Sequence, residues 1–460
     1  MAAVGLVVAL GAAAGAAVAA APGARLSGDE PHYLLTAISV AEDANLDIAD
    51  ELASRRYQPF HTLPLDAQGG PMGDGRHLSP HDPLLPVLLA PATAFGGWLA
   101  AKLVLAAMAG LLAALLVWTA VRRLGTPLPM AVLVVGTFSL SPPLAVYATQ
   151  LYPELPAALL ATVAIALLTG PLGPPACWAL AASLIGLPWL SVKYVPVAAT
   201  LAGVALARLC KRADYRPVGR LVAVLAVAAA AYLVLHQRIY GGWTPYAAGG
   251  QFATGEFGVM GDDPDYGARS GRLLGLLVDT RFGLAAWQPA WLLAVPALAA
   301  LLRRRPPGWA AMSVPLAGGW LTAAFLAVRM HGWWWPGRHT LAALPAAVLA
   351  IAWWAGTRHP PPATLRWTGM VGVLGYAWLL IEGIAGHHTW VAGFWRTTYP
   401  PYQLWRLALP DLQHLGAGTW ILGASWLAVL TILAIGSWRS PPPAAQSLAG
   451  QPPTHGGAPT

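Results

Sequence analysis

The stretch SGDEPHYLL, residues 27–35, places two adjacent carboxylates, Asp29 and Glu30, directly after the first apolar segment of the chain. Pro31 suits the first turn of a helix, so Glu30 would be its N-cap and Asp29 would lie at the positive end of the helix dipole. A chemical interpretation stands beside this structural one. In it, Asp29 is a general base at the boundary between water and lipid, where burial raises the pKa of a carboxyl group. The stretch alone leaves both interpretations open.

The composition around this stretch is that of an integral membrane protein. The chain has 460 residues, of which 57% are hydrophobic and 10% charged, and its mean hydropathy is +0.56. A soluble domain carries about 25% charged residues. The apolar stretches, of roughly 17 to 25 residues, suit membrane-spanning α-helices, whereas barrel strands would be shorter and alternating. We therefore expect an all-α polytopic membrane protein.

Twelve membrane-spanning helices are expected, separated by three long polar loops at 25–82, 239–282 and 385–415. The main membrane region covers 1–355, further membrane helices cover 356–436, and 437–460, rich in Pro, Gly and Ala, form a disordered tail. The expected spans are 3–22, 85–118, 129–148, 153–170, 174–190, 194–209, 220–238, 283–302, 309–328, 338–355, 367–384 and 416–436.

The arginines indicate the orientation of these helices. With the N-terminus inside, short basic loops such as Arg122–Arg123, 208–220 and Arg303–Arg305 lie in the cytoplasm, as the positive-inside rule expects. Of the 19 acidic residues, only Asp214 would then lie inside. We therefore expect cytoplasmic termini and extracytoplasmic long loops. The Arg-rich, Lys-poor usage indicates a bacterial plasma membrane. The net charge of +8 is scattered over segment ends, so no nucleic-acid partner is expected.

Candidate polar groups gather at the expected outer surface. The first loop returns through GRHLSPHDPLL (75–85), which brings His77, His81 and Asp82 back to the level of Asp29. These side chains could contact a sugar or a metal ion, or they could be turn residues before the next helix. Two histidines four residues apart with one aspartate are a weak metal pattern. A metal site therefore stays open.

Three charged residues stand at other outer helix ends. Glu154, in LYPELPAALL, is a carboxylate near the membrane boundary, where such groups are usually paired or functional. Lys193, in LPWLSVKY, either extends its amine to the surface or contacts a lipid phosphate. Arg338, in GWWWPGRHTLAALP, begins an apolar segment at its extracytoplasmic end, so the positive-inside rule does not explain an arginine there. Its guanidinium is well suited to bind a phosphate with two hydrogen bonds. Trp334 and Trp335 fit an interfacial belt or stacking on a substrate.

Nucleotide-binding and nucleophile-elbow patterns are absent from the sequence. It contains no GxSxG elbow, P-loop or GxGxxG loop that would fit a soluble nucleotide on the cytoplasmic face. The candidate groups lie on the outer side, where nucleotide sugars are not expected. A lipid-borne substrate follows from this.

Six stretches, taken in order over most of residues 1–355, resemble the GT-C superfamily of polyprenyl-phosphate-sugar-dependent glycosyltransferases. The likeness is to bacterial relatives of protein mannosyltransferases and aminoarabinose transferases, and it implies a GT-C-like bundle with extracytoplasmic loop helices. One departure is that His339 follows the arginine, where family members often have an aromatic residue. The stretches are GDEPHYL, SPHDPLLPVLLAPA, LYPELPAALL, LPWLSVKY, GLLVDTRFGLAAWQPAWLL and GWWWPGRHTLAALP.

The resemblance implies transfer of a monosaccharide from a polyprenyl phosphate to a hydroxyl of a glycan, lipid or protein, with inversion. Asp29 would be the catalytic base, with Glu30 beside it, and Lys193, Arg338 and His339 would face the donor phosphate. No organic cofactor is expected, and a divalent metal ion stays open. The residues expected to contact substrate are His32, Tyr33, His81, Asp82, Glu154, Trp334 and Trp335.

Two other classes of function also suit twelve spans: a transporter or flippase of a lipid-linked sugar, and a non-catalytic partner in envelope assembly. In a carrier, Glu154 and Lys193 would be coupling sites. The large polar loops and the lack of a two-fold repeat in segment lengths favour the transferase. The transferase interpretation requires Asp29, Lys193 and Arg338 to line one cavity that is open to both the lipid and the outer face.

Overall fold

The structure is a computed structural model that describes residues 1–212, 214–248, 255–261, 263–358 and 363–439. This part of the chain contains helices and no β-strand, only isolated bridges such as Ala24 to His61 and Asp47 to Leu78. The expected all-α class is confirmed. The last helix runs to Arg439, into the expected tail, and residues 440–460 lie outside the described residues, as do 249–254 and 262 of the second long loop.

Nineteen α-helices follow one another along the described residues: α1 (Ala2–Ala13), α2 (Glu30–Glu42), α3 (Ala49–Ala53), α4 (Leu84–Leu124), α5 (Leu128–Ser139), α6 (Leu144–Tyr147), α7 (Glu154–Leu168), α8 (Pro174–Leu190), α9 (Val195–Leu209), α10 (Arg216–Tyr240), α11 (Tyr266–Ser270), α12 (Arg272–Val278), α13 (Leu284–Trp287), α14 (Ala294–Arg304), α15 (Trp309–Leu321), α16 (Leu344–Gly356), α17 (Ala363–Ile384), α18 (Pro400–Trp405) and α19 (Ala417–Arg439). Single turns of 3₁₀-helix, with one π-helical turn at η6, join them: η1 (Ala14–Ala17), η2 (Val192–Tyr194), η3 (Pro245–Ala248), η4 (Glu256–Met260), η5 (Pro289–Leu293), η6 (Thr322–Leu326), η7 (Arg338–Thr340), η8 (Phe394–Arg396) and η9 (Arg406–Ala408).

Apolar helices long enough to cross a bilayer make up much of this bundle. Six segments of the described chain are both long enough and apolar enough to cross a membrane, and the described chain also has five shorter apolar helices. The count of twelve spans therefore stays a prediction. The six are Leu84–Leu124, Val192–Leu209, Arg216–Ala248, Trp309–Leu326, Ala363–Ile384 and Ala417–Arg439, and the five are Ala2–Ala17, Leu128–Ser139, Glu154–Leu168, Pro174–Leu190 and Leu344–Gly356.

Helix α4 is too long to be one straight span. Its 41 residues would extend about 60 Å, twice the hydrocarbon thickness of about 30 Å. The helical path is interrupted at Gly96 and Gly97, where Gly97 has φ 56° and ψ −147°. Phe95, beside this break, is 94% exposed. The span expected at 85–118 therefore consists of two helical pieces with different directions.

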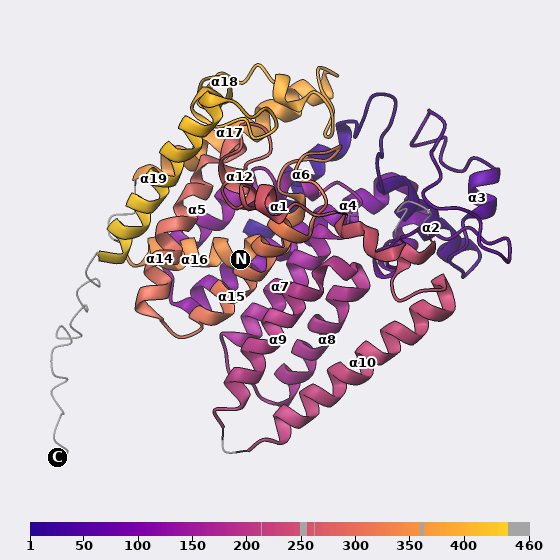
Figure 1. The fold of residues 1–460 in the computed structure, drawn as a ribbon, viewed down its shortest axis with the longest axis horizontal. Coiled ribbons are helices and arrows are strands. Elements are labelled where there is room, and N and C mark those ends of the chain that lie inside the picture. Colours follow the sequence, from indigo (N-terminus) through magenta and orange to yellow (C-terminus); the bar gives the residue numbers. More distant parts are fainter. Residues whose placement is uncertain (213, 249–254, 262, 359–362, 440–460) are drawn as a thin grey trace, which may run out of the picture.

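Helices of this bundle differ strongly in burial. Every residue of α16 from Leu344 to Ala355 is buried, whereas α10 and α19 bury only a few residues each and lie at the periphery. The turn between α9 and α10 lies at the bottom of Figure 1, and the first-loop helices α2 and α3 lie at the far right, near the opposite end of α10. The first loop is thus carried at one end of the bundle.

Asp82, at the end of the first loop, is hydrogen-bonded to the helical bundle. Its Oδ1 accepts hydrogen bonds from the Tyr232 hydroxyl (2.8 Å) and from His236 Nε2 (3.0 Å), and its Oδ2 accepts one from the Val192 N–H (2.9 Å). Asp82 is 2% exposed. The expectation that Asp82 contacts substrate is therefore corrected, because both of its oxygens are engaged by the protein itself.

Replacing Asp82 by Ala should lower the free energy of unfolding by at least about 2 kcal/mol, because the buried donors of Tyr232 and His236 would lose their acceptor. The measurement is the thermal unfolding midpoint of the purified protein in detergent. Glu42→Ala is the matched control, because its ion pair with Arg56 is exposed and contributes about 0–1 kcal/mol. Equal midpoints for the two variants would contradict the assignment.

Candidate active site

Asp29 stands at the start of α2 with its side chain turned away from that helix. It occupies the N-cap position, yet its carboxylate makes no capping hydrogen bond. Instead, Oδ1 accepts a hydrogen bond from Gln68 Nε2 (3.0 Å) and Oδ2 accepts one from Arg338 Nη2 (2.5 Å). Gly28 makes this turn possible, because its φ is +61° and a Cβ there would lie 2.8 Å from the Tyr152 hydroxyl. Helix capping therefore does not explain Asp29.

Glu30 points in another direction. It is fully buried, its Oε2 accepts a hydrogen bond from the Ser27 N–H (3.0 Å), and its Oε1 accepts one from the Leu151 N–H (2.8 Å). Both oxygens therefore hold the start of α2 against the turn before α7. The catalytic role expected for Glu30 stays a prediction; in the structure both of its carboxylate oxygens accept backbone hydrogen bonds, and the residue does not line the cavity described below.

Arg338 joins two carboxylates that are far apart in the sequence. Besides Asp29, its Nε donates to Glu154 Oε1 (2.9 Å), and Lys193 Nζ donates to the same oxygen (2.6 Å). The guanidinium also lies over the Tyr152 ring at 4.1 Å. Two cations and two carboxylates thus alternate in a formally neutral network. Since Glu154 is fully buried and the Arg338 side chain only 11% exposed, each charge depends on its partners.

Gly337 sets the direction in which Arg338 leaves the backbone. Its φ is +88°, and a Cβ at this position would lie 2.9 Å from both Leu284 Cδ2 and Pro143 Cγ. Only glycine adopts such a conformation without a steric cost. The PGRH motif therefore has a structural requirement directly before its charged residue.

The ionisation of the site follows from burial and from Arg338. Burial alone would raise the pKa of Asp29, but the charge of Arg338, together with hydrogen bonds from Arg338 and Gln68, holds it well below its usual value. Burial lowers the pKa of His81, and burial beside Lys193 lowers that of His339 to about 3. At neutral pH the site therefore contains a charged Asp29 and neutral imidazoles.

A cavity of about 550 Å³ opens beside this network. Of the site residues expected from the sequence, seven line it: Asp29, Tyr33, His81, Lys193, Trp334, Arg338 and His339. Its remaining wall comes from η2 and α9, from the ends of α15 and η6, and from six residues of the second long loop: Thr244, Tyr246, Glu256, Phe257, Val259 and Met260. Asp29, Lys193 and Arg338 therefore line one cavity, and its opening to both the lipid and the outer face stays a prediction.

A second cavity, of about 770 Å³, lies next to the first between α8, α9 and α10. The two cavities share the lining residues Val192, Val195, Thr244 and Phe257. The wall of the second cavity is almost entirely apolar, and it contains no charged residue among the described part of the chain. A charged chamber and an apolar chamber thus adjoin one another.

Besides Asp82, three expected substrate contacts lie outside the first cavity. Trp335 is fully buried and packs against Trp287 and Trp390, so its interpretation as a substrate contact is corrected. His32 is also corrected, since it is buried and its Nε2 lies 3.2 Å from the Asp66 carbonyl oxygen. Glu154 lies behind the wall, where it holds Lys193 and Arg338.

Gln68 is a site residue that the sequence did not indicate. Its Nε2 donates to Asp29, and its Oε1 lies 2.9 Å from His81 Nε2, so it connects two cavity residues. His81 in turn stacks on Tyr33, with ring centroids 4.5 Å apart. Gln68 lies in the polar stretch LDAQGGPMG, which has no periodicity and no motif. No signal in the sequence distinguishes it.

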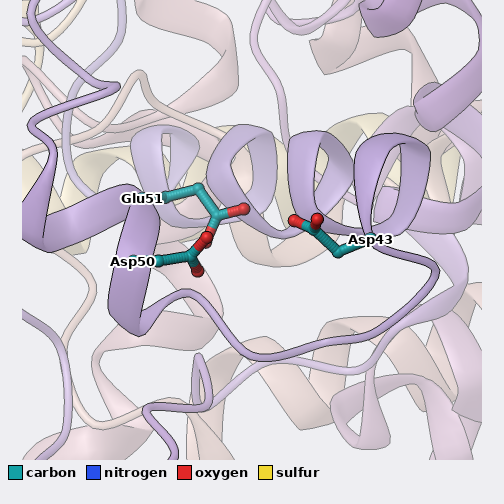
Figure 2. Close-up of side chains that lie close together, drawn as sticks. All are labelled: Asp43, Asp50 and Glu51. Atoms are coloured by element: carbon teal, nitrogen blue, oxygen red, sulfur yellow. The ribbon is translucent and has the colours of Figure 1, made fainter.

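A potential metal-binding group lies away from this cavity. Within the described ranges, the one group of three or more potential ligands comprises Asp43, which follows α2, and Asp50 and Glu51 of α3 (Figure 2). None of these residues lines the cavity. Among the described cavity residues, no three His, Cys, Asp or Glu side chains lie close enough together to hold one ion.

The fold of the helical bundle is similar to that of solved structures. The structure is similar to the crystal structure of ArnT from Cupriavidus metallidurans in the apo state, with a TM-score of 0.51 and 12% identity over 94% of this chain and 74% of that one. The structure of the same protein bound to undecaprenyl phosphate gives a TM-score of 0.48 at 12% identity, over 94% and 77% of the two chains. No family model and no curated protein sequence matches the chain. The protein is therefore a multi-pass membrane protein with this fold.

Replacing Gly337 by Ala should lower the thermal unfolding midpoint, because the positive φ alone costs an L-residue about 1–2 kcal/mol and the new Cβ would displace Leu284 or Pro143. Gly136→Ala in α5 is the control, because its Cβ would meet nothing within 4 Å and alanine favours a helix. An unchanged midpoint in Gly337→Ala would refute the conformational requirement.

Proposed function

We propose that the protein transfers a monosaccharide from a polyprenyl-phosphate donor to an acceptor hydroxyl outside the cytoplasm, with inversion. The observation that carries the proposal is the meeting of Asp29, Arg338 and Lys193 on one cavity, although they come from three distant parts of the chain. A carboxylate next to two cations supplies a proton acceptor and a site for a phosphate. The fold supports a transferase that uses a lipid-linked sugar.

The lipid nature of the donor is supported by the pair of adjoining cavities. A phosphate placed at Arg338 and Lys193 would have the apolar chamber between α8, α9 and α10 within reach of its lipid chain. Burial of isoprenoid carbons there contributes about 0.8 kcal/mol per CH₂-sized group. The polyprenyl class itself comes from the resemblance of the six sequence stretches.

The proposed reaction is a single displacement. The acceptor oxygen attacks the anomeric carbon as Asp29 takes its proton, and the bond between that carbon and the phosphate oxygen breaks. The bonding electrons leave with the lipid phosphate, whose negative charge grows in the transition state. Arg338 and Lys193 stabilise that charge, so their contribution is largest at the transition state.

The free protein holds Asp29 in a restrained state. Its carboxylate is paired with Arg338, and the pKa of Asp29 is correspondingly low, which makes it a weak base. A donor phosphate competes for the same guanidinium. As the phosphate binds, Asp29 loses part of this stabilisation and its pKa rises toward a value useful for proton transfer.

The extracytoplasmic side of the reaction and the bacterial plasma membrane are part of the proposal. They are supported by the position of the first loop, near the end of α10 opposite to the Arg-rich turn between α9 and α10 (Figure 1). Glycan, lipid and protein hydroxyls are all candidate acceptors on that side.

Asp29→Asn should abolish sugar transfer from a polyprenyl-phosphate donor by the purified protein, because the amide cannot accept the proton. Arg338→Gln should lower kcat on the order of 10²–10³-fold, the cost of losing one donor to a developing oxyanion. Arg396→Gln, which removes an exposed guanidinium outside the cavity, is the control for charge.

Full activity of Asp29→Asn would remove the proposed base. Movement of the lipid-linked sugar across proteoliposomes, with no transfer to any acceptor, would favour the flippase instead.

The pH dependence of kcat/KM tests the pairing with Arg338, because this parameter reports ionisations of the free enzyme. The low pKa of Asp29 keeps its carboxylate charged as the pH falls, so no acidic limb should occur between about pH 8 and 5. In Arg338→Gln, burial without the guanidinium raises the Asp29 pKa, and an acidic limb should enter this range. Identical profiles in the two proteins would contradict the pairing.

A further inference from the structure

Three carboxylates from two helices of the first loop converge at the end of α2 that lies away from Asp29. Asp43 follows the last residue of α2, and Asp50 and Glu51 lie in the first turn of α3. Figure 2 shows their carboxylates turned toward one another. One oxygen from each lies within 4.8 Å of the others, and none of the three forms an ion pair within the described ranges.

The spacing of these oxygens fits one shared cation. Oxygen ligands bind Ca²⁺ at about 2.3–2.6 Å, so two ligands of one ion are separated by at most about 5 Å. The three oxygens already satisfy this limit without any movement. The C-terminal end of α2 adds the negative end of its dipole to the three carboxylates, which favours a cation further.

Glu51 distinguishes this group from an ordinary acidic surface. Asp43 and Asp50 are exposed, but Glu51 is only 3% exposed, and its Oε2 is buried without a hydrogen-bond partner. A buried carboxylate oxygen without a donor is costly, and a bound cation would satisfy it.

We propose that Asp43, Asp50 and Glu51 form a divalent-cation site, of the all-oxygen kind that Ca²⁺ prefers, which fixes the first loop. Ca²⁺ suits carboxylates in flexible geometry, with water completing its shell, whereas Zn²⁺ prefers nitrogen and sulfur ligands. The site is separate from the cavity and needs no sugar donor.

The position of this site suggests what the cation would stabilise. Asp43 belongs to the helix that begins after Asp29. The segment between Asp43 and Asp50 is hydrogen-bonded to His77 in the last part of the first loop. Asp47 Oδ1 accepts a hydrogen bond from the His77 N–H (2.8 Å), and the Ile48 N–H donates one to the His77 carbonyl (2.9 Å). From His77 the chain continues to His81 in the cavity. An effect of the cation on sugar transfer would rest on the proposed function, whereas its binding would not.

The test is calorimetric titration of the full-length protein in detergent with CaCl₂, after treatment with a chelator and without any donor. We expect one site with a Kd of about 10⁻⁴–10⁻³ M, a range typical of extracellular modules, and a thermal midpoint that rises with Ca²⁺. Asp50→Asn and Asp43→Asn should weaken binding at least tenfold, and as exposed residues they should leave the fold intact. Asp74→Asn is the matched control: it is an exposed acid of the same loop, paired with Arg76.

No binding up to 10 mM Ca²⁺ would overturn the site, as would equal binding by all variants or loss of binding in Asp74→Asn. Binding of Mg²⁺ in place of Ca²⁺, with the same variant pattern, would overturn the choice of ion. A transferase assay on the same samples separates the two proposals, because Ca²⁺ binding without transfer would refute the proposed function and leave the cation site standing.

Discussion

The structure depends on one guanidinium that serves two carboxylates. Arg338 closes the first loop onto the membrane bundle through Asp29, and it holds the start of α7 through Glu154. Charges this deeply buried are stable only when they are paired with opposite charges. Removal of one partner from such a network lowers the stability of the fold by about 3–5 kcal/mol. The chain therefore cannot assemble this end of the bundle without also assembling the cavity wall. Fold and candidate site therefore depend on the same ion pairs. This is why Gly28, directly before Asp29, and Gly337, directly before Arg338, both have backbone conformations that glycine favours.

How much of the site could be predicted depended on how rare each residue type is in its surroundings. Asp29, Glu154, Lys193 and Arg338 stood out because ionised groups are scarce in a chain with 10% charged residues, and all four meet in the structure. The sequence did not show which of two adjacent, chemically similar residues belongs to the site. The N-cap of the helix is Asp29, one residue earlier than the expected Glu30, and a shift of one residue rotates a side chain by about 100° around the helix axis. In the same way, composition cannot tell Trp334, on the cavity, from Trp335, in the core.

The fold was more accessible than the site, because hydropathy reports helices one at a time whereas a cavity requires their mutual arrangement. The all-α class followed from composition, and each expected span overlaps a helix. The break in α4 at Gly96 and Gly97 is a local feature that the paired glycines indicate once the length of the helix is known. Gln68 is the opposite case. It connects Asp29 with His81 only because a polar loop folds back over the start of α2, and nothing short of the tertiary structure reveals that path.

The pair of cations beside the cavity has a consequence for turnover. In the proposed reaction, the glycosylated carrier is a phosphodiester with a single negative charge, whereas the carrier left behind is a monoester with about −1.5 to −2 at neutral pH. Arg338 and Lys193 would therefore attract the spent carrier more strongly than a fresh one. Accumulation of bare lipid phosphate in the membrane would slow the protein by occupancy alone, so its rate would follow how quickly the cell recharges or removes that lipid.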